Sequence, residues 1–199
     1  MANNQSEISD TMRGLSQDEA ENIRRNDNCM NVVHPPINCP AWACVVLPCI
    51  NKIPSMKQFL QMTPLDAEVL RDSEWICYDP SSLVRGDVIR LAPRDIVPAD
   101  CIILEVYGEE IVVDVSGVTG EPKPRIGTKK GGGDSIHVYY GSRVLQGSAL
   151  AKVLQIGENT LLARMMKENR WPPSRKIESN VSDGQYNTIG NEDDNAETV

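Results

Sequence analysis

Side chains that could do chemistry gather in two stretches of this chain. One is Thr119-Gly120-Glu121, which joins a hydroxyl, a residue without a side chain and a carboxylate. Taken alone, this triplet is typical of an ordinary β turn with a solvated glutamate. The other stretch holds three cysteines, Cys39, Cys44 and Cys49. The chain has only two histidines, so its sequence supports no Ser/His/Asp or Cys/His constellation.

The three cysteines lie in an uncharged apolar run that also contains Trp42. Their spacing is wider than the Cys-x-x-Cys of a zinc site, although His34 could be a fourth ligand. Three interpretations stay open: a buried apolar hook, S-acylation of Cys39, Cys44 and Cys49, or a metal site. We favour the hook, and we predict no metal and no cofactor. Acylation of two or three cysteines would hold stably at a membrane, so we expect a fraction of the protein to sediment with membranes.

The composition restricts the class of protein. The chain has 199 residues, of which 40% are apolar and only 5% aromatic, so its core must rest on Val, Ile and Leu. The net charge of −8 argues against a general affinity for nucleic acid or for bare anionic lipid. The first thirty residues lack the apolar run of a signal peptide, and prolines interrupt the longest uncharged stretch, 28–51. The sequence therefore predicts a soluble, cytoplasmic protein with reduced thiols.

The pattern along the chain divides it into four parts. They are a mobile N-terminal arm (1–28), a proline- and cysteine-rich apolar hook (29–65), a β domain (66–168) and an acidic disordered tail (169–199). Prolines forbid long regular elements in the hook, and the tail has few apolar residues to bury. The β domain contains its own strands and a final helix, so we expect residues 66–168 to fold alone.

The β domain is predicted from short apolar runs that are rich in β-branched residues and separated by turn signals. These runs cover 69–71, 75–78, 88–91, 101–104, 111–113, 137–140 and 151–154. Their density indicates a mainly β fold, either a compact sandwich or a barrel. Helices are expected over 17–25 after the capping box of Ser16 and Glu19, over 55–62 after Pro54, and from Asn159 or Thr160 to near Trp171.

Five further blocks accompany the Thr119-Gly120-Glu121 triplet. They cover 83–89, 95–100, 112–116, 140–144 and 157–164. In this order and spacing, residues 66–168 resemble the actuator domain of a P-type ATPase, the family of cation pumps. The resemblance implies a distorted jelly-roll or β-sandwich domain with a C-terminal helix. Pro122 after the triplet, together with residues 147–150 and 157–164, is similar to the heavy-metal-transporting branch.

The resemblance also implies a role for the triplet. In this family the glutamate of the loop orients and activates the water that hydrolyses an aspartyl phosphate, a reaction that needs a positioned water and a base. By resemblance, Glu121 would be the catalytic carboxylate. Thr119 and Gly120 would complete the loop, and Gly120 would let the loop approach the phosphate closely because it carries no side chain.

Other residues of these blocks are expected to be structural. Gly86-Asp87 makes a turn into a strand, Pro98 fixes a corner, and Asp100 hydrogen-bonds nearby backbone. Two positions depart from the family pattern. Val115 stands where the pumps usually have an acidic residue, and Arg94-Asp95 stands where they often have Gly-Asp. The change at Val115 weakens the case for an active loop.

The missing parts of a pump shape the functional expectation. The chain has no Asp-Lys-Thr-Gly-Thr motif, which carries the phosphorylated aspartate in the family, and no nucleotide domain. We therefore expect no ATP binding or hydrolysis by the chain alone. The first hypothesis is a stand-alone, non-catalytic binding or regulatory module for a membrane ATPase or another complex, peripheral on the cytosolic face of a membrane.

Two alternatives remain. The chain could be the actuator piece of a split cation-transporting ATPase, with Glu121 active in trans, or an incomplete gene product without an independent role. Pro172-Pro173 and an acidic tail follow the last helix in place of a membrane span, which favours a finished soluble protein.

Overall fold

The computed structural model describes residues 13–37, 53–128 and 136–173. Cys39, Cys44 and Cys49 lie outside these ranges, so the hook, the acylation and the metal interpretations stay predictions. Most of the predicted acidic tail also lies outside them. Among the described residues, no helix is both long enough and apolar enough to cross a membrane.

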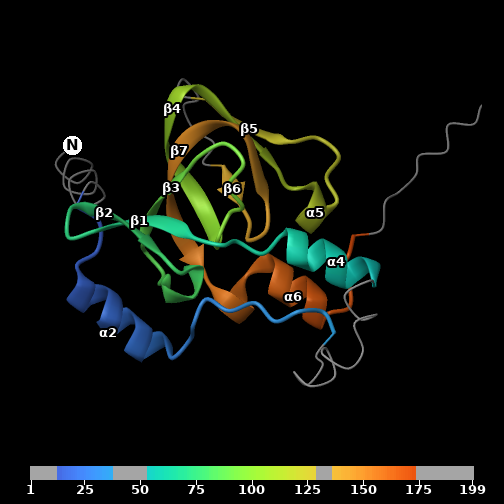
Figure 1. The fold of residues 1–199 in the computed structure, drawn as a ribbon, viewed down its shortest axis with the longest axis horizontal. Helices are drawn as coiled ribbons and strands as arrows, with labels where there is room; N and C mark the ends of the chain where they lie inside the picture. Colours follow the sequence, from blue (N-terminus) through green and yellow to red (C-terminus); the bar gives the residue numbers. More distant parts are fainter. Residues whose placement is uncertain (1–12, 38–52, 129–135, 174–199) are drawn as a thin grey trace, which may run out of the picture.

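The β domain is one seven-stranded sheet, and this confirms the mainly β prediction. Its strands are β1 (Ala67–Arg71), β2 (Glu74–Tyr78), β3 (Val88–Leu91), β4 (Asp100–Asp114), β5 (Arg125–Thr128), β6 (His137–Val138) and β7 (Arg143–Gln155). The order is β2-β1-β3-β7-β4-β5, with β6 also paired to β4, and every pairing is antiparallel. Figure 1 shows the β1–β2 hairpin at one end of the molecule and the short helices α4 (Pro54–Gln61) and α6 (Leu161–Lys167) at the other.

The two long strands β4 and β7 form the centre of the sheet. The predicted strands 101–104 and 111–113 turn out to be the two ends of β4, which runs for 15 residues. The sequence hid this continuity because much of the middle of β4 is polar and exposed, as at Glu105 and Glu109. Register shifts, including one between Tyr107 and Val112, interrupt its pairing with β7, and bulges of this kind bend a strand.

A buried ion pair fixes the start of the sheet. Arg71 of β1 is 1% exposed and donates two hydrogen bonds to the carboxylate of Asp87, at 3.1 and 2.7 Å. The same carboxylate accepts the backbone N–H of Val84 at 2.8 Å, which closes the turn through Gly86. The expected structural role of Gly86-Asp87 is thereby confirmed, and the pair is fully desolvated.

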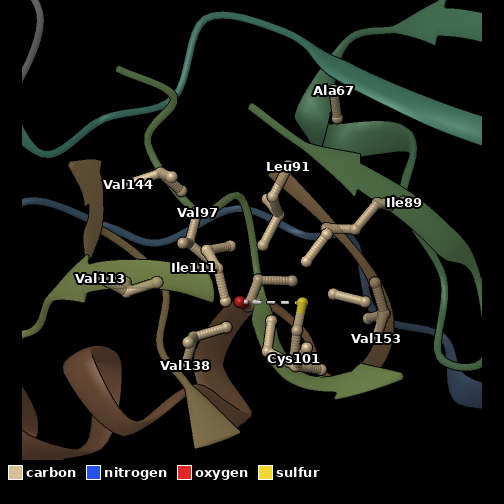
Figure 2. Packing of buried hydrophobic residues seen from close by; sticks show 14 of the residues in the cluster. Ala67, Ile89, Leu91, Val97, Cys101, Ile111, Val113, Val138, Val144 and Val153 are labelled. Carbon is tan, nitrogen blue, oxygen red and sulfur yellow. Dashed lines mark hydrogen bonds between the residues drawn. The ribbon is translucent and has the colours of Figure 1, made fainter. Parts of the chain in front are cut away.

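The larger group of buried side chains, which we call the sheet core, packs between the strands of the sheet and the loops that join them. Figure 2 shows Cys101 among Val, Ile and Leu side chains, with its thiol directed at the carbonyl oxygen of Ala99, 3.2 Å away. Burial raises the pKa of the Cys101 thiol, so this cysteine behaves as a small apolar residue. The core rests on β-branched and aliphatic residues, as the scarcity of aromatics predicts.

A second group, the helical cluster, lies where α4 and α6 meet. Its buried members are Val33, Phe59, Met62, Val118, Tyr140, Leu162, Ala163 and Trp171. Both helices were expected: α4 begins with Pro54 at its first turn, and the Thr160 side chain caps α6. The cluster nevertheless takes side chains from both sides of the predicted domain boundaries at 65/66 and 168/169. These boundaries stay predictions, but they cut through a shared core.

The N-terminal segment is attached to the sheet. The capping box of Ser16 and Glu19 is present, and it begins α2 (Gln17–Asp27) as expected. Arg24 donates to the carbonyl oxygen of Ser82 at 2.6 Å, and Asp27 accepts two bonds from Arg85, each 2.7 Å long. The described part of the predicted mobile arm is therefore docked, because its charged side chains find partners on the β domain.

Asn31 continues this attachment beyond α2. It is 4% exposed, and its side-chain amide donates to the carbonyl oxygens of Pro80 and Pro98, both at 2.8 Å. Its side-chain oxygen accepts the N–H of Gly157 at 2.9 Å. One polar side chain thus joins three loops of the β domain.

Candidate functional site

Thr119, the first residue of the triplet, ends a single helical turn that the sequence did not predict. This turn, α5 (Ser116–Thr119), comes directly after β4. The N–H groups of Val118 and Thr119 donate to the carbonyl oxygen of Val115, at 3.0 and 2.9 Å. Gly120 ends the turn in the left-handed conformation, with φ of 78°. Only a residue without a Cβ adopts this conformation cheaply, so a turn that stops here favours glycine.

The side chain of Val115 explains the departure from the pump pattern at this position. Val115 is 0% exposed and belongs to the sheet core, whereas Val118, one turn later, is 0% exposed and belongs to the helical cluster. An ionised acidic side chain in place of Val115 would be buried, at a high desolvation cost unless it found a partner. The turn before the triplet is therefore anchored in both clusters.

The hydroxyl of Thr119 completes the geometry of the loop. It donates to the carbonyl oxygen of Val115 at 3.2 Å and accepts the N–H of Glu121 at 3.3 Å. The threonine thus links the turn to the glutamate that follows it. Gly120 and Glu121 are both exposed, so this part of the loop faces the solvent.

The Glu121 carboxylate is held by Arg125. The guanidinium donates to both carboxylate oxygens, at 2.8 and 3.2 Å, while the Glu121 side chain stays 45% exposed. This pairing lowers the pKa of Glu121, against a smaller opposing effect of partial burial. The carboxylate is ionised at neutral pH and is a weaker base than an unpaired glutamate.

Arg125 is itself held in place. It donates to the carbonyl oxygen of His137 at 2.7 Å and lies 4.9 Å from the centre of the Tyr139 ring, a cation–π distance. The sequence analysis missed both Arg125 and Tyr139 as partners of the site. The only sequence signal was an opposite charge four residues after Glu121. That spacing has structural meaning within a helix, and the prolines at 122 and 124 exclude one here.

Asp100 holds the scaffold next to the site, as expected. Its carboxylate accepts the N–H of Tyr140 at 2.9 Å and the N–H of Leu161, at the start of α6, at 2.7 Å. Burial raises the pKa of Asp100, and these two hydrogen bonds oppose that rise. The residue joins β4 to the helical cluster and does not contact the triplet in any bond that the structure records.

Other features of the described residues do not belong to this site. A surface hollow of about 610 Å³ lies against β1, β2 and β3, where Arg90 stacks 4.3 Å from the Trp75 ring and pairs with Glu68 at 2.8 Å. None of the triplet residues lines it. Across the described ranges, no group of three or more His, Cys, Asp or Glu side chains could hold a metal ion.

Comparison with known proteins identifies relatives over the same part of the chain. A family model described as the P-type ATPase actuator domain matches residues 61–170. The chain is 41% identical over 95 residues to a protein of Dictyostelium discoideum named as a probable plasma membrane ATPase, covering 48% of this chain and 8% of that protein. It is 32% identical over 119 residues to the alpha subunit of a sodium/potassium-transporting ATPase of Hydra vulgaris, covering 55% of this chain and 11% of that protein.

The relatives are much longer than the region they share with this chain. The matches span between 8% and 14% of the length of four curated relatives. Among solved structures, a zinc-transporting PIB-type ATPase in an E2.Pi state is 25% identical, with a TM-score of 0.47 over 61% of this chain and 20% of that one. The heavy-metal branch stays a prediction.

Proposed function

Because the chain belongs to the family of P-type ATPase actuator domains, we propose that it is a binding and regulatory module. In this proposal its Thr119-Gly120-Glu121 loop docks on the phosphorylated domain of a membrane ATPase, or on another complex that offers a similar surface. The module binds without catalysing the release of phosphate. The partner, and the cytosolic face of a membrane as the place of action, are parts of the same proposal.

The observation that carries the proposal is the pairing of Glu121 with Arg125. A general base must accept a proton, and the guanidinium lowers the proton affinity of this carboxylate. If Glu121 left this pair, the Arg125 guanidinium would lose its counter-ion while it is still held by His137 and Tyr139. In the paired state, a partner meets an exposed loop in which the charges of Glu121 and Arg125 compensate each other.

The alternative is that the chain supplies the dephosphorylation loop in trans to a pump whose own loop is inactive. The feature that favours it is exposure: the Glu121 side chain is 45% exposed, and Gly120 places no side chain between the loop and a phosphoryl group. In this alternative a bound phosphoryl group attracts Arg125, and Glu121 is released to orient a water.

One experiment separates the two functions. A P-type ATPase with the glutamate of its own loop replaced by glutamine would be phosphorylated from ATP and mixed with the full chain. The binding module should co-sediment with the phosphorylated ATPase and leave its dephosphorylation rate unchanged. A faster rate that Glu121→Gln abolishes would establish the alternative, and absence of binding in all states would exclude this ATPase as a partner in either function.

Membrane association is tested separately. We propose that part of the native protein is held at the membrane by acyl groups on Cys39, Cys44 and Cys49, residues outside the described ranges. The membrane-sedimenting fraction should fall when all three are changed to serine, which keeps the size but forms no thioester. Equal and complete solubility of wild type and triple variant would remove this part of the proposal.

A further inference from the structure

The carbonyl oxygen of Gly117 has no partner inside its own helical turn. In α5, the carbonyls of Val115 and Ser116 accept the N–H groups of Val118, Thr119 and Gly120. The next N–H along the chain, that of Glu121, turns instead to the Thr119 hydroxyl at 3.3 Å. The last carbonyls of a helix need such partners from elsewhere, and here they come from distant parts of the chain.

Two side chains donate to this oxygen, one from the segment that precedes the β domain in the sequence and one from the segment that follows it. The indole N–H of Trp171 lies 2.9 Å from it, 54 residues along the chain. The side-chain amide of Gln58, in α4, lies 3.3 Å from it and is separated by 59 residues. The segment before the sheet and the segment after it therefore both bind the carbonyl oxygen of Gly117, three residues before Gly120.

The same two segments enclose the turn by packing. Trp171 is 6% exposed and shares the helical cluster with Val118. A Cβ added to Gly117 would lie 3.3 Å from the sulfur of Met62, and one added to Gly120 would lie 2.9 Å from the Cβ of Pro173. Both segments therefore lie so close to the turn that they leave little room for a side chain at Gly117 or Gly120.

We propose that Trp171 is a positioning residue for the Thr119-Gly120-Glu121 loop and that it acts, together with Gln58, through the carbonyl oxygen of Gly117. The inference rests on the proposed docking function for its biological meaning, but the positioning is a property of the chain alone. Neither donor forms a recorded hydrogen bond with Glu121, so both act on the loop through the backbone. Segments outside the sheet thus contribute to the conformation of the loop, together with Val115 in the sheet core and Arg125 of β5.

Hydrogen exchange on the full chain, with no ATPase present, tests this directly. Trp171→Phe keeps an aromatic ring in the cluster but removes the N–H donor. We expect the Thr119 and Gly120 amides to exchange about three- to tenfold faster, as the loss of one hydrogen bond implies. Gln58→Met should have less than about a threefold effect, because its bond is the longer one. In the double variant, the increase in exchange rate should exceed the product of the increases in the two single variants, since the oxygen then has neither of its two donors.

Controls separate positioning from general stability. Trp75→Phe makes the same chemical change on β2, at the far end of the sheet, and should leave the loop amides unchanged. Unchanged exchange at residues 118–120 in Trp171→Phe would overturn the proposal. A uniform increase in exchange rate that includes the amides of β3 and β4 would overturn it as well. So would a double variant whose increase in exchange rate only equals the product of the increases in the single variants. A failure of ATPase binding would contradict the proposed function and leave this measurement intact.

Discussion

The sheet core and the helical cluster differ in how far apart their members lie in the sequence. The sheet core takes all its buried members from residues 67–156, where antiparallel pairing makes most of them neighbours. The helical cluster joins residues as distant as Val33 and Trp171. Its members come from the entering segment, from α4 and the residue after it, from α5, from Tyr140, from α6 and from the chain after α6.

The candidate loop lies at the junction of these two regions. Val115 is buried in the sheet core and Val118 in the helical cluster, so α5 connects them within four residues. Different stretches of the chain supply the two regions, so a variant can perturb one region at a time. Such variants show what each region contributes to stability and to the position of the loop.

The largest effect should come from removing the distant parts of the helical cluster. We compare the fragment 53–173 with the fragment 66–168, which lacks Phe59, Met62 and Trp171. Three buried apolar side chains of this size contribute roughly 5–9 kcal/mol as an upper bound. Urea unfolding should show a free energy of unfolding lower by several kcal/mol for the shorter fragment. Equal free energies of unfolding for the two fragments would support the predicted boundaries. They would also mean that the distant parts of the helical cluster do not stabilise the fold.

The next effect belongs to the sheet. Asp87→Ala would leave the guanidinium of Arg71, which is 1% exposed, without its counter-ion. Removing one partner of a buried pair costs about 3–5 kcal/mol, and chemical denaturation should show a loss of this size. The matched control is Glu68→Gln, which breaks the half-exposed pair with Arg90 and should cost under about 1 kcal/mol. Similar losses for the two variants would show that the Arg71–Asp87 pair is not desolvated.

The sequence predicted the sheet better than the cluster, for a physical reason. Strands such as 88–91 show their burial in a short run of apolar residues, because the side chains they meet lie on neighbouring strands. β5 was missed because it is mostly exposed, and only Gly127 among its residues is buried. The two predicted strands of β4 were separated by polar residues that still follow the path of the strand.

The candidate site divides in the same way. The triplet itself could be found from the sequence because its residue types and flanking blocks resemble a known family. The residues that fix it could not: Arg125 reaches Glu121 across a proline-containing loop, and Trp171 reaches Gly117 across 54 residues. No local pattern encodes contacts that depend on the path of the whole chain.

A smaller effect should come from the single side chain that ties the entering segment to the sheet. Asn31→Ala removes three hydrogen bonds and takes the recorded partner from the carbonyl oxygen of Pro98 and the N–H of Gly157, whereas the carbonyl oxygen of Pro80 keeps the N–H of Leu83 at 3.2 Å. The expected loss is about 2–3 kcal/mol in the free energy of unfolding, measured by urea denaturation. Its neighbour Val32 is 39% exposed, and Val32→Ala should change the same quantity by no more than about 0.5 kcal/mol. A loss no greater than that of Val32→Ala would mean that the N-terminal segment is only loosely docked.

The smallest effect is electrostatic and falls on the loop itself. The pKa of Glu121 is lowered by Arg125, so the folded protein binds this proton more weakly than the unfolded chain. The pair therefore stabilises the fold fully above the unfolded value, about 4.3, and this contribution disappears as the pH falls through the lower folded value. Because the Glu121 side chain is 45% exposed, solvent screening limits the gain to about 0.5 kcal/mol.

The free energies of unfolding of wild type and Glu121→Gln, measured in urea, should differ by this amount at pH 7 and converge near pH 3. A difference that persists at pH 3 would arise from packing rather than from charge. A difference of several kcal/mol at pH 7 would make Glu121 a structural residue, and the division between a stabilising sheet and a loop free to bind would no longer hold.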